Sequence, residues 1–372
     1  MGLDLDRARM PEQDPRERRG NFREVNLGLS REPARREAAR CLYCKRPTCI
    51  EGCPVHINIP HFLRALVEDD PAEAVRRIRA DNALPAICGR VCPQETQCEQ
   101  ACVMNKKGAP IAIGALERYV GDHALRECLA GECPPVSRPE RIAVVGSGPS
   151  GLTCAGDLRK LGYAVTVFEA LHELGGVLSY GIPEFRLPKD AVVRPEIESL
   201  RASGVDFETD VIVGKGVTVP ELLGEEGYAA VYVATGAGAP AFMGIPGEDL
   251  NYVYSANEFL TRVNLMRAYQ GERSATPVRV GRRAAVVGGG NTAMDAARSA
   301  LRLKGVEEVF LIYRRSEREM PARIEEVKHA REEGITFHFL TTPSAWLGDA
   351  SGDLRAVRCR RMDLGEPDAS GR

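Results

Sequence analysis

The chain has 372 residues, a formal net charge of −2 and 44% hydrophobic residues. This length predicts two or three domains with a sizeable buried core, and the balanced charge gives no reason to expect binding to nucleic acid or to an anionic membrane surface. No apolar run approaches the roughly 20 residues that span a bilayer. The first residues lack the apolar segment typical of a signal peptide, so we expect a cytoplasmic location.

Residues 1 to about 40 are charged and rich in arginine. Long charged side chains lie mostly at the protein surface. We therefore expect a solvated arm or the outer face of a helix, on which the following arginines are exposed: Arg16, Arg18, Arg19, Arg35, Arg36 and Arg40.

Eight of the twelve cysteines form two short groups. Their spacings are Cys41-x2-Cys44-x4-Cys49-x3-Cys53 and Cys88-x3-Cys92-x5-Cys98-x3-Cys102. Eight thiolates match the ligand demand of two 4Fe-4S clusters, each held by about four side chains. Zinc, the alternative, favours paired CxxC units, and only one such pair is present. A disulfide framework is typical of short secreted chains. The cysteines therefore predict two 4Fe-4S clusters.

Short helices are expected around the cysteine groups, and one of them begins at Asp70-Pro71. The aspartate side chain can accept a hydrogen bond from a free backbone N–H, and proline suits the first helical position. No strand-rich segment precedes residue 140. We expect a small helical iron–sulfur domain over residues 1–135, which ends in a linker at 131–135.

A glycine fingerprint, Gly146-x-Gly148-x-x-Gly151, directly follows an apolar strand at 142–145. The glycines permit a tight turn, close approach of a pyrophosphate and close packing of helix on strand. The next predicted strand, 164–168, ends at Glu169, where an acidic side chain can bind a ribose hydroxyl. The order of strand, turn, helix, strand and acid predicts a dinucleotide site.

A second fingerprint, Gly288-x-Gly290-Asn291-Thr292-Ala293, follows the predicted strand 284–287. The strand after it, 309–313, ends in Arg314 and Arg315 in place of an acid. Arginine can pair with a 2′-phosphate that a carboxylate would repel, so this site favours NADPH over NADH. The alternative is a solvated charge pair. Two dinucleotide sites beside iron–sulfur ligands suggest an intervening flavin, and the first site suits FAD.

These motifs resemble the glutamate synthase small-subunit family of NADPH-dependent FAD and iron–sulfur oxidoreductases. The resemblance runs from about Phe22 to Arg372 and is carried by CLYCKRPTCIEGCPVHINIP, ICGRVCPQETQCEQACV, VVGSGPSGLTCAGDL, YGIPEFRLPK, VVGGGNTAMDAARSAL and YRRSEREMPA. A similar module forms part of dihydropyrimidine dehydrogenase and of electron-bifurcating NADH-dependent ferredoxin:NADP oxidoreductase.

The resemblance implies that the two cysteine groups exchange ligands. One cluster would be held by Cys41, Cys44, Cys49 and Cys102. The other would be held by Cys53, Cys92 and Cys98, with Glu117 as the expected fourth ligand and Cys88 as its rival. A similar exchange occurs in two-cluster ferredoxins.

The resemblance also implies further cofactor contacts. Gly175, Gly176, Thr235 and Gly236 would approach FAD, and the segment 180–186, which ends at Arg186, would lie near the flavin. For NADPH the implied residues are Asn291, Thr292, Arg314 and Arg315. Hydride transfer requires no acid–base residue, so no catalytic side chain is named.

The expected fold is a helical two-cluster domain followed by α/β structure: a Rossmann-like FAD domain over 136–250 and an incomplete Rossmann-like NADPH domain over 251–372. Family members continue beyond Arg372, so we expect the segment that returns to the FAD domain to be missing here. The implied function is electron input from NADPH through FAD and two 4Fe-4S clusters to a glutamate synthase large subunit or another flavin or iron–sulfur acceptor.

Three alternatives remain open at this point. The chain could be a large subunit of an NADH-dependent ferredoxin:NADP oxidoreductase or of a sulfide dehydrogenase, or a non-catalytic electron-transfer module. Cys128-x4-Cys133 has the spacing of a disulfide reductase pair but precedes the FAD fingerprint. Cys154 is expected to be buried in the first-fingerprint helix, and Cys359 is unassigned.

Overall fold

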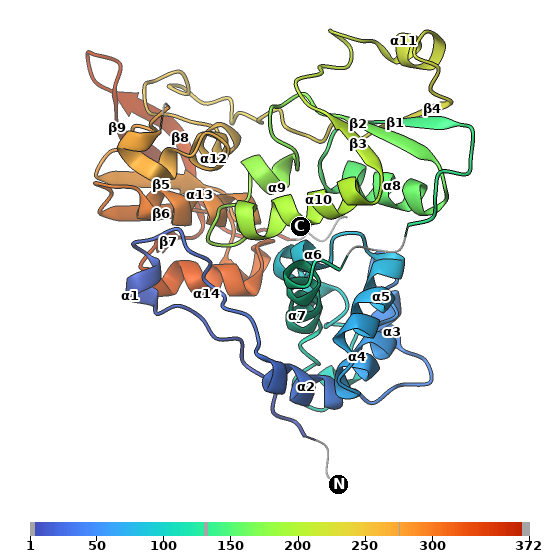
Figure 1. Cartoon of the computed structure of the whole chain (residues 1–372). Coiled ribbons are helices and arrows are strands. Elements are labelled where there is room, and N and C mark those ends of the chain that lie inside the picture. Colours follow the sequence, from blue (N-terminus) through green and yellow to red (C-terminus); the bar gives the residue numbers. More distant parts are fainter. Residues whose placement is uncertain (1–3, 130–132, 275, 367–372) are drawn as a thin grey trace. The chain divides into compact units, whose positions relative to one another are not determined.

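The computed structural model describes residues 4–129, 133–274 and 276–366 (Figure 1). It divides into two compact units. Unit 1 comprises residues 1–12, 24–179 and 186–237, and unit 2 comprises residues 13–23, 180–185 and 238–372. The chain therefore passes between the units several times. The linker expected at 131–135 lies largely outside the described residues.

The first part of unit 1 is helical, as the sequence predicts. Its helices are α2 (Arg31–Ala39), α3 (Thr48–Glu51), α4 (Ile59–Val67), α5 (Pro71–Asp81), α6 (Pro85–Val91) and α7 (Ile113–Arg126), with 3₁₀ segments η1 (Gln94–Thr96) and η2 (Val103–Lys106). Among the described residues before Arg141 the only β-pairing is an isolated bridge between Glu12 and Asn26. The apolar faces of these helices share a core that includes Phe62, Leu63, Ile78 and Leu116.

Helix α5 begins as its sequence predicts. The Asp70 side chain accepts a hydrogen bond from the Glu73 backbone N–H at 2.8 Å, and Pro71 occupies the first turn. Val75 and Ile78 are buried one turn apart. Local capping and an apolar stripe are thus sufficient to explain this helix.

The second part of unit 1 contains a parallel sheet in the order β3-β2-β1-β4. Its elements are β1 (Arg141–Val145), α8 (Pro149–Lys160), β2 (Ala164–Phe168), α9 (Val177–Tyr180), the π-helical segment η3 (Lys189–Val193), α10 (Arg194–Ala202), β3 (Val205–Glu208), α11 (Val219–Gly224) and β4 (Ala230–Val233). In the central strand Val144 pairs with Val167 on one side and Tyr232 on the other. A strand bonded on both sides and covered by helices must be apolar throughout, which explains the run of Ile142–Val145.

Unit 2 contains a second parallel sheet, β5-β6-β7, and an antiparallel hairpin. Its elements are α1 (Pro15–Arg18), α12 (Ala256–Asn264), the 3₁₀ segment η4 (Ala268–Arg273), β5 (Arg283–Val287), α13 (Asn291–Arg302), β6 (Glu308–Ile312), the 3₁₀ segment η5 (Glu317–Glu319), α14 (Ile324–Glu332), β7 (Thr336–His338), β8 (Thr341–Gly348) and β9 (Leu354–Arg361). Leu311, Met294 and Ala297 are fully buried between sheet and helices. The two Rossmann-like sheets confirm the predicted fold class.

Two arginines of the N-terminal segment contradict the expected solvated arm. The Arg18 side chain is 0% exposed because it pairs with Glu332 at 2.6 Å and with Glu333 at 3.1 Å. Arg40 is also buried, where it pairs with Glu37 at 2.6 Å and donates to the Ala109 carbonyl. Glu37 is a local partner, one helical turn before Arg40, whereas Glu332, Glu333 and Ala109 become adjacent to these arginines only in the folded chain. In the described part of the chain, no helix is both long and apolar enough to cross a membrane.

Candidate functional site

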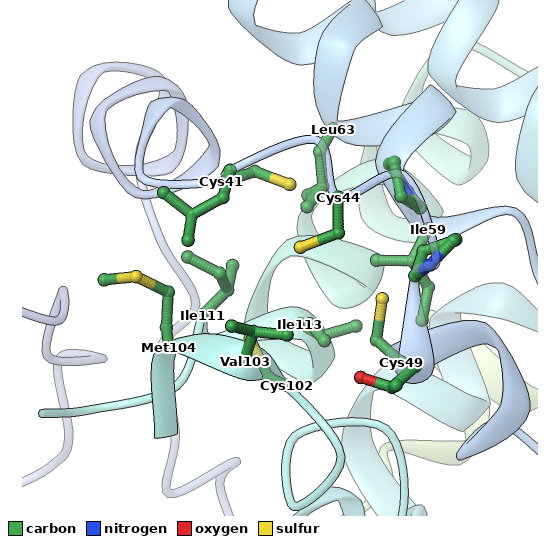
Figure 2. Close-up of a pocket in the computed structure, with 14 residues that line it drawn as sticks. Cys41, Cys44, Cys49, Ile59, Leu63, Cys102, Val103, Met104, Ile111 and Ile113 are labelled. Carbon is green, nitrogen blue, oxygen red and sulfur yellow. The ribbon is translucent and has the colours of Figure 1, made fainter. Parts of the chain in front are cut away.

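The first cysteine site is a pocket in the helical part of unit 1. Its four cysteines are Cys41, Cys44, Cys49 and Cys102. In Figure 2 the side chains of Cys41, Cys44 and Cys49 face one another across the pocket. The rest of the lining is largely apolar and includes Ile59, Leu63, Met104, Ile111 and Ile113. The structure thus places Cys102, from the second group, with three cysteines of the first.

Burial affects the protonation of two of these thiols, those of Cys41 and Cys49. It raises the pKa of Cys41, and together with the neighbouring Cys102 and Cys41 sulfurs it raises the pKa of Cys49 to about 12. Four thiols in an apolar pocket suit a soft, multiply charged ligand such as an iron–sulfur cluster. Because ligation requires thiolates, loading this pocket with a cluster would release protons.

A second group of acidic and sulfur-bearing side chains lies in the same part of unit 1. Burial, with the charges of Glu117 and Cys92, raises the pKa of Cys53. Burial also raises the pKa of Cys98, with contributions from Glu99, Glu117, Cys53 and Cys92. Cys53, Cys92, Cys98 and Glu117 thus lie within electrostatic reach of one another.

Both rivals for a fourth ligand lie beside Cys92. Glu117 is 5% exposed, and its carboxylate accepts a hydrogen bond from Asn82 at 2.8 Å. The Cys88 thiol donates to the side-chain oxygen of the same asparagine at 3.7 Å. Burial raises the pKa of Glu117 to about 8. A buried carboxyl group of this kind needs either a proton or a cation. Glu117 and Cys88 both remain candidate ligands.

Two glycines that the sequence analysis did not single out bring Glu117 to this place. A Cβ atom on Gly89 of α6 would lie 2.3 Å from the Arg118 backbone nitrogen of α7. A Cβ on Gly121 of α7 would lie 2.4 Å from the Ala86 nitrogen of α6. The two helices can therefore cross closely only because both residues lack a side chain. In the sequence, this close crossing is indicated by one glycine in each of two successive helices, Gly89 in α6 and Gly121 in α7.

The first glycine loop follows β1, and its three glycines face different surroundings. Gly146 has a φ of +105°, and a Cβ there would lie 2.4 Å from the Ala234 carbonyl oxygen. A Cβ on Gly151 would lie 1.9 Å from the Gly146 oxygen. A Cβ on Gly148 would meet no atom within 4 Å. Two glycines are thus required by packing, whereas Gly148 leaves open space at the start of α8, where a pyrophosphate can approach.

Glu169 binds the glycine loop itself. Its carboxylate accepts hydrogen bonds from the Ser147 N–H at 3.0 Å and from the Ser147 hydroxyl at 2.5 Å, and its other oxygen accepts from the Leu171 N–H. The Ser147 hydroxyl also accepts from the Gly175 N–H at 2.9 Å. Ser147 occupies a position of the motif that is not a glycine. Its hydroxyl thus links Glu169 and the backbone at Gly175 to the first glycine loop. The ribose contact of Glu169 remains a prediction.

The other residues predicted to bind FAD are Gly176, Thr235, Gly236 and Arg186. A Cβ on Gly176 would lie 2.8 Å from the Gly148 Cα. Thr235 is exposed just after β4, and Gly236 has a φ of +69°. Arg186 is half-buried and belongs to unit 1, whereas residues 180–185 belong to unit 2.

The second glycine loop lies in unit 2 between β5 and α13. Gly288 has a φ of +139°, and Gly290 is open except for a distant Pro321 side chain. The middle residue, Gly289, is the one limited by packing, because its Cβ would lie 2.6 Å from the Tyr313 ring. Asn291 accepts a hydrogen bond from the Arg323 N–H at 3.0 Å, and Thr292 is exposed.

Arg314 and Arg315 follow Tyr313, the first residue after β6 in unit 2. Arg314 is exposed and Arg315 is half-buried. Neither guanidinium has a hydrogen bond or ion pair within the described ranges. Both are therefore available to an anionic ligand at the carboxyl end of the sheet.

The remaining cysteines form no redox disulfide, and all twelve cysteines, which lie within the described residues, are free. Cys128 and Cys359 are exposed. Cys154 is half-buried, not fully buried as expected, whereas Leu152 and Ala155 of the same helix are buried.

Comparison with known proteins agrees with this arrangement. The family of dihydropyrimidine dehydrogenase domain II, 4Fe-4S cluster, matches residues 18–129, and the pyridine nucleotide-disulphide oxidoreductase family matches residues 140–363. FprA of Mycobacterium tuberculosis, a solved structure, shares the fold with a TM-score of 0.52 at 24% identity over 63% of this chain and 66% of its own.

Three relatives illustrate the range of proteins whose sequences are similar to this chain. The glutamate synthase [NADPH] small chain of Escherichia coli is 36% identical over all of this chain, which covers 78% of that protein. The NADP(+)-dependent formate dehydrogenase subunit beta of Moorella thermoacetica and the NADPH-Fe(3+) oxidoreductase subunit beta of Geobacter sulfurreducens are each 39% identical over 87% of this chain, which spans 47% of each of them.

The fold and the motifs define a pyridine-nucleotide-dependent oxidoreductase with NADPH, FAD and 4Fe-4S clusters as its cofactors. The chain belongs to the glutamate synthase small-chain family. The family, fold class, enzyme class and cofactors predicted from the sequence are confirmed.

Proposed function

We propose that the chain is the electron-input subunit of a glutamate synthase, in which electrons from NADPH leave through two 4Fe-4S clusters for a large partner subunit. One observation carries the proposal: the chain combines a pocket of four cysteines with two glycine loops. The strand that follows the first loop and its helix leads to Glu169, and the strand that follows the second leads to Arg314 and Arg315. The first ending suits FAD and the second suits NADPH. We propose domain limits of 1–135, 136–250 and 251–372.

The chain's own residues bind and orient the cofactors. Gly148 leaves space for the FAD pyrophosphate at the start of α8. Arg314 and Arg315 are available to the 2′-phosphate of NADPH. When bound, FAD supplies the conversion between the two-electron chemistry of NADPH and the one-electron chemistry of the clusters. In this proposal the protein positions donor and acceptor and needs no acid–base side chain.

Two cysteine sets would hold the clusters. Cys41, Cys44, Cys49 and Cys102 line one pocket and are the proposed ligands of the first. Cys53, Cys92 and Cys98, with Glu117, are the proposed ligands of the second. The twelve free cysteines suit a reducing compartment, and we propose the cytoplasm.

A second partner class is supported by the relatives. Beta subunits of a formate dehydrogenase and of an NADPH-Fe(3+) oxidoreductase match the chain at 39% identity. The same electron-input chain could therefore serve an acceptor other than a glutamate synthase large subunit.

The experiment is anaerobic purification of the full chain, followed by addition of NADPH. We expect co-purified flavin to bleach with NADPH and weakly with NADH, and about eight iron and eight sulfide atoms per chain. Zinc in place of iron, or a flavin that NADPH does not reduce, would contradict the proposal. Pull-down with a candidate glutamate synthase large subunit, followed by glutamate formation from glutamine and 2-oxoglutarate, tests the partner separately.

A further inference from the structure

Two arginines at the end of β9, Arg360 and Arg361, are exposed and have no role in the function proposed above. Neither makes an ion pair or a side-chain hydrogen bond within the part of the chain that the structure describes. Their position in the sheet topology connects them with the NADPH site.

The topology of unit 2 brings the end of β9 to the carboxyl edge of the parallel sheet. β6 and β7 are parallel, so both end at this edge. β8 begins at Thr341, shortly after β7 ends, and β9 returns antiparallel to it. Arg361 consequently lies opposite Thr341, at the first pair of the hairpin.

Consecutive backbone hydrogen bonds fix this placement. The Thr341 N–H donates to the Tyr313 carbonyl at 3.0 Å, and the Leu340 N–H donates to the Arg315 carbonyl at 3.1 Å. The Met362 N–H donates to the Leu340 carbonyl at 2.8 Å. Leu340 is therefore hydrogen-bonded both to Arg315 and to Met362, the residue that follows Arg361.

The charge at this edge is strongly positive. Arg314 and Arg315 at the end of β6 and Arg360 and Arg361 at the end of β9 lack acidic partners among the described residues. Nearby Glu317 is paired with Arg331 at 2.5 Å, and Glu319 accepts from the Ser316 hydroxyl at 2.6 Å. Gathered guanidinium groups without counter-charges repel one another and favour an anion. A phosphate monoester matches their planar donor geometry.

We propose that Arg361 is a specificity-determining residue that binds the 2′-phosphate of NADPH together with Arg314 and Arg315. This inference rests on the proposed function, because it concerns the same dinucleotide site. It extends that site from the glycine fingerprint and β6 to a hairpin that follows them in the chain. Arg361 is preferred to Arg360 because it forms the hairpin pair nearest to Arg315.

The test is the substitution Arg361→Ala in the full chain loaded with its flavin. We expect kcat/KM for NADPH to fall about tenfold, mainly through KM, with kcat/KM for NADH unchanged, because one charge-assisted hydrogen bond to phosphate is lost. Affinity for 2′,5′-ADP, measured by calorimetry, should fall by a similar factor, whereas affinity for 5′-AMP should not change. Arg361→Lys should restore part of the NADPH preference.

Arg358→Ala is the matched control, because Arg358 is an exposed arginine on the same strand but farther from the sheet edge. The ratio of kcat/KM for NADPH to kcat/KM for NADH is compared among the variants. If this ratio is equal in Arg361→Ala and Arg358→Ala but lower in Arg314→Ala, the result would overturn this inference and leave the proposed function intact. An unchanged chain that shows no preference for NADPH over NADH would overturn both.

Discussion

Glu196 of α10 accepts a hydrogen bond from the Ala86 backbone N–H of α6 at 2.7 Å. The two residues belong to different parts of unit 1: α10 packs beside the parallel sheet, and α6 carries Cys88. The Glu196 side chain is fully buried, and Arg79 lies 3.6 Å from its second oxygen. One carboxylate thus ties the first turn of a cysteine-bearing helix to the dinucleotide-binding part of the chain.

We predict that Glu196→Ala lowers the free energy of unfolding by about 1–3 kcal/mol, because it leaves a buried N–H without its acceptor. The measurement is urea unfolding followed by circular dichroism. Glu198→Ala on the exposed face of the same helix is the control and should change stability little. Equal effects of the two substitutions would show that the bond to Ala86 is unimportant.

The same carboxyl group predicts a pH dependence. Burial raises the pKa of Glu196 from 4.5 to about 7, with Arg79 and the Ala86 N–H partly opposing it. A raised pKa in the folded state contributes stability below pH 4.5 that is lost as pH rises through about 7. The difference in the free energy of unfolding between Glu196→Gln and the unchanged chain should therefore grow in favour of Glu196→Gln as the pH rises from 4.5 to about 7. A pH-independent difference would contradict the assignment.

Unit 2 contains a buried ion cluster centred on Glu333. Its carboxylate accepts hydrogen bonds from Arg298 at 2.6 Å and from Arg302 at 2.8 Å, and it also pairs with Arg18. Burial alone would raise the pKa of Glu333, but the bonds and charges of these arginines outweigh it and hold the pKa well below its usual range. The cluster therefore stabilises the fold at neutral pH, and this stability is lost as the pH falls below 4.5.

We predict that Glu333→Ala costs about 3–5 kcal/mol, because it leaves buried guanidinium groups without their counter-charge. The single tryptophan of the chain, Trp346, lies in β8 of unit 2, so its fluorescence during urea unfolding reports this unit. Glu317→Ala, which breaks the exposed pair with Arg331, is the control and should cost less than about 1 kcal/mol. Similar losses in both variants would contradict the prediction.

The glycines of the first loop should separate binding from folding. Gly148→Ala should fold normally, since its Cβ meets no atom within 4 Å, but should lose flavin because the methyl group occupies the space for the pyrophosphate. Gly151→Ala should fail to fold, since its Cβ would lie 1.9 Å from a backbone oxygen. Flavin content and thermal unfolding measure the two effects. If Gly148→Ala binds a full complement of flavin, the pyrophosphate does not lie against Gly148 and the prediction is wrong.

Cluster ligation predicts distinct losses of iron. Cys102→Ser should lower iron to about half, because it opens the first pocket while the second group is intact. Glu117→Gln should likewise remove one cluster, whereas Cys88→Ser should retain both. Exposed Cys128→Ser is the control. Iron analysis and electron paramagnetic resonance of the reduced chain provide the measurement. Loss of a cluster in Cys88→Ser but not in Glu117→Gln would reverse the assignment.

The sequence by itself predicted the helical cysteine-rich part, the two Rossmann-like sheets and their glycine loops. These features depend on residues close together in the chain: the cap at Asp70, the apolar run of Ile142–Val145 and the arginines that follow β6. Local backbone geometry and periodicity are sufficient to specify them. Family resemblance added the association of Cys102 with Cys41, Cys44 and Cys49, which spacing alone left open.

Only the tertiary structure decided which charged residues are buried. Arg18 looked like part of a solvated arm, but it reaches Glu333, and Glu196 reaches Ala86, both across long stretches of sequence. The same holds for Gly89 and Gly121, whose missing side chains let α6 and α7 cross. Burial of a charge is stable only with a specific partner, and the identity of that partner depends on how distant segments pack, which no local pattern records.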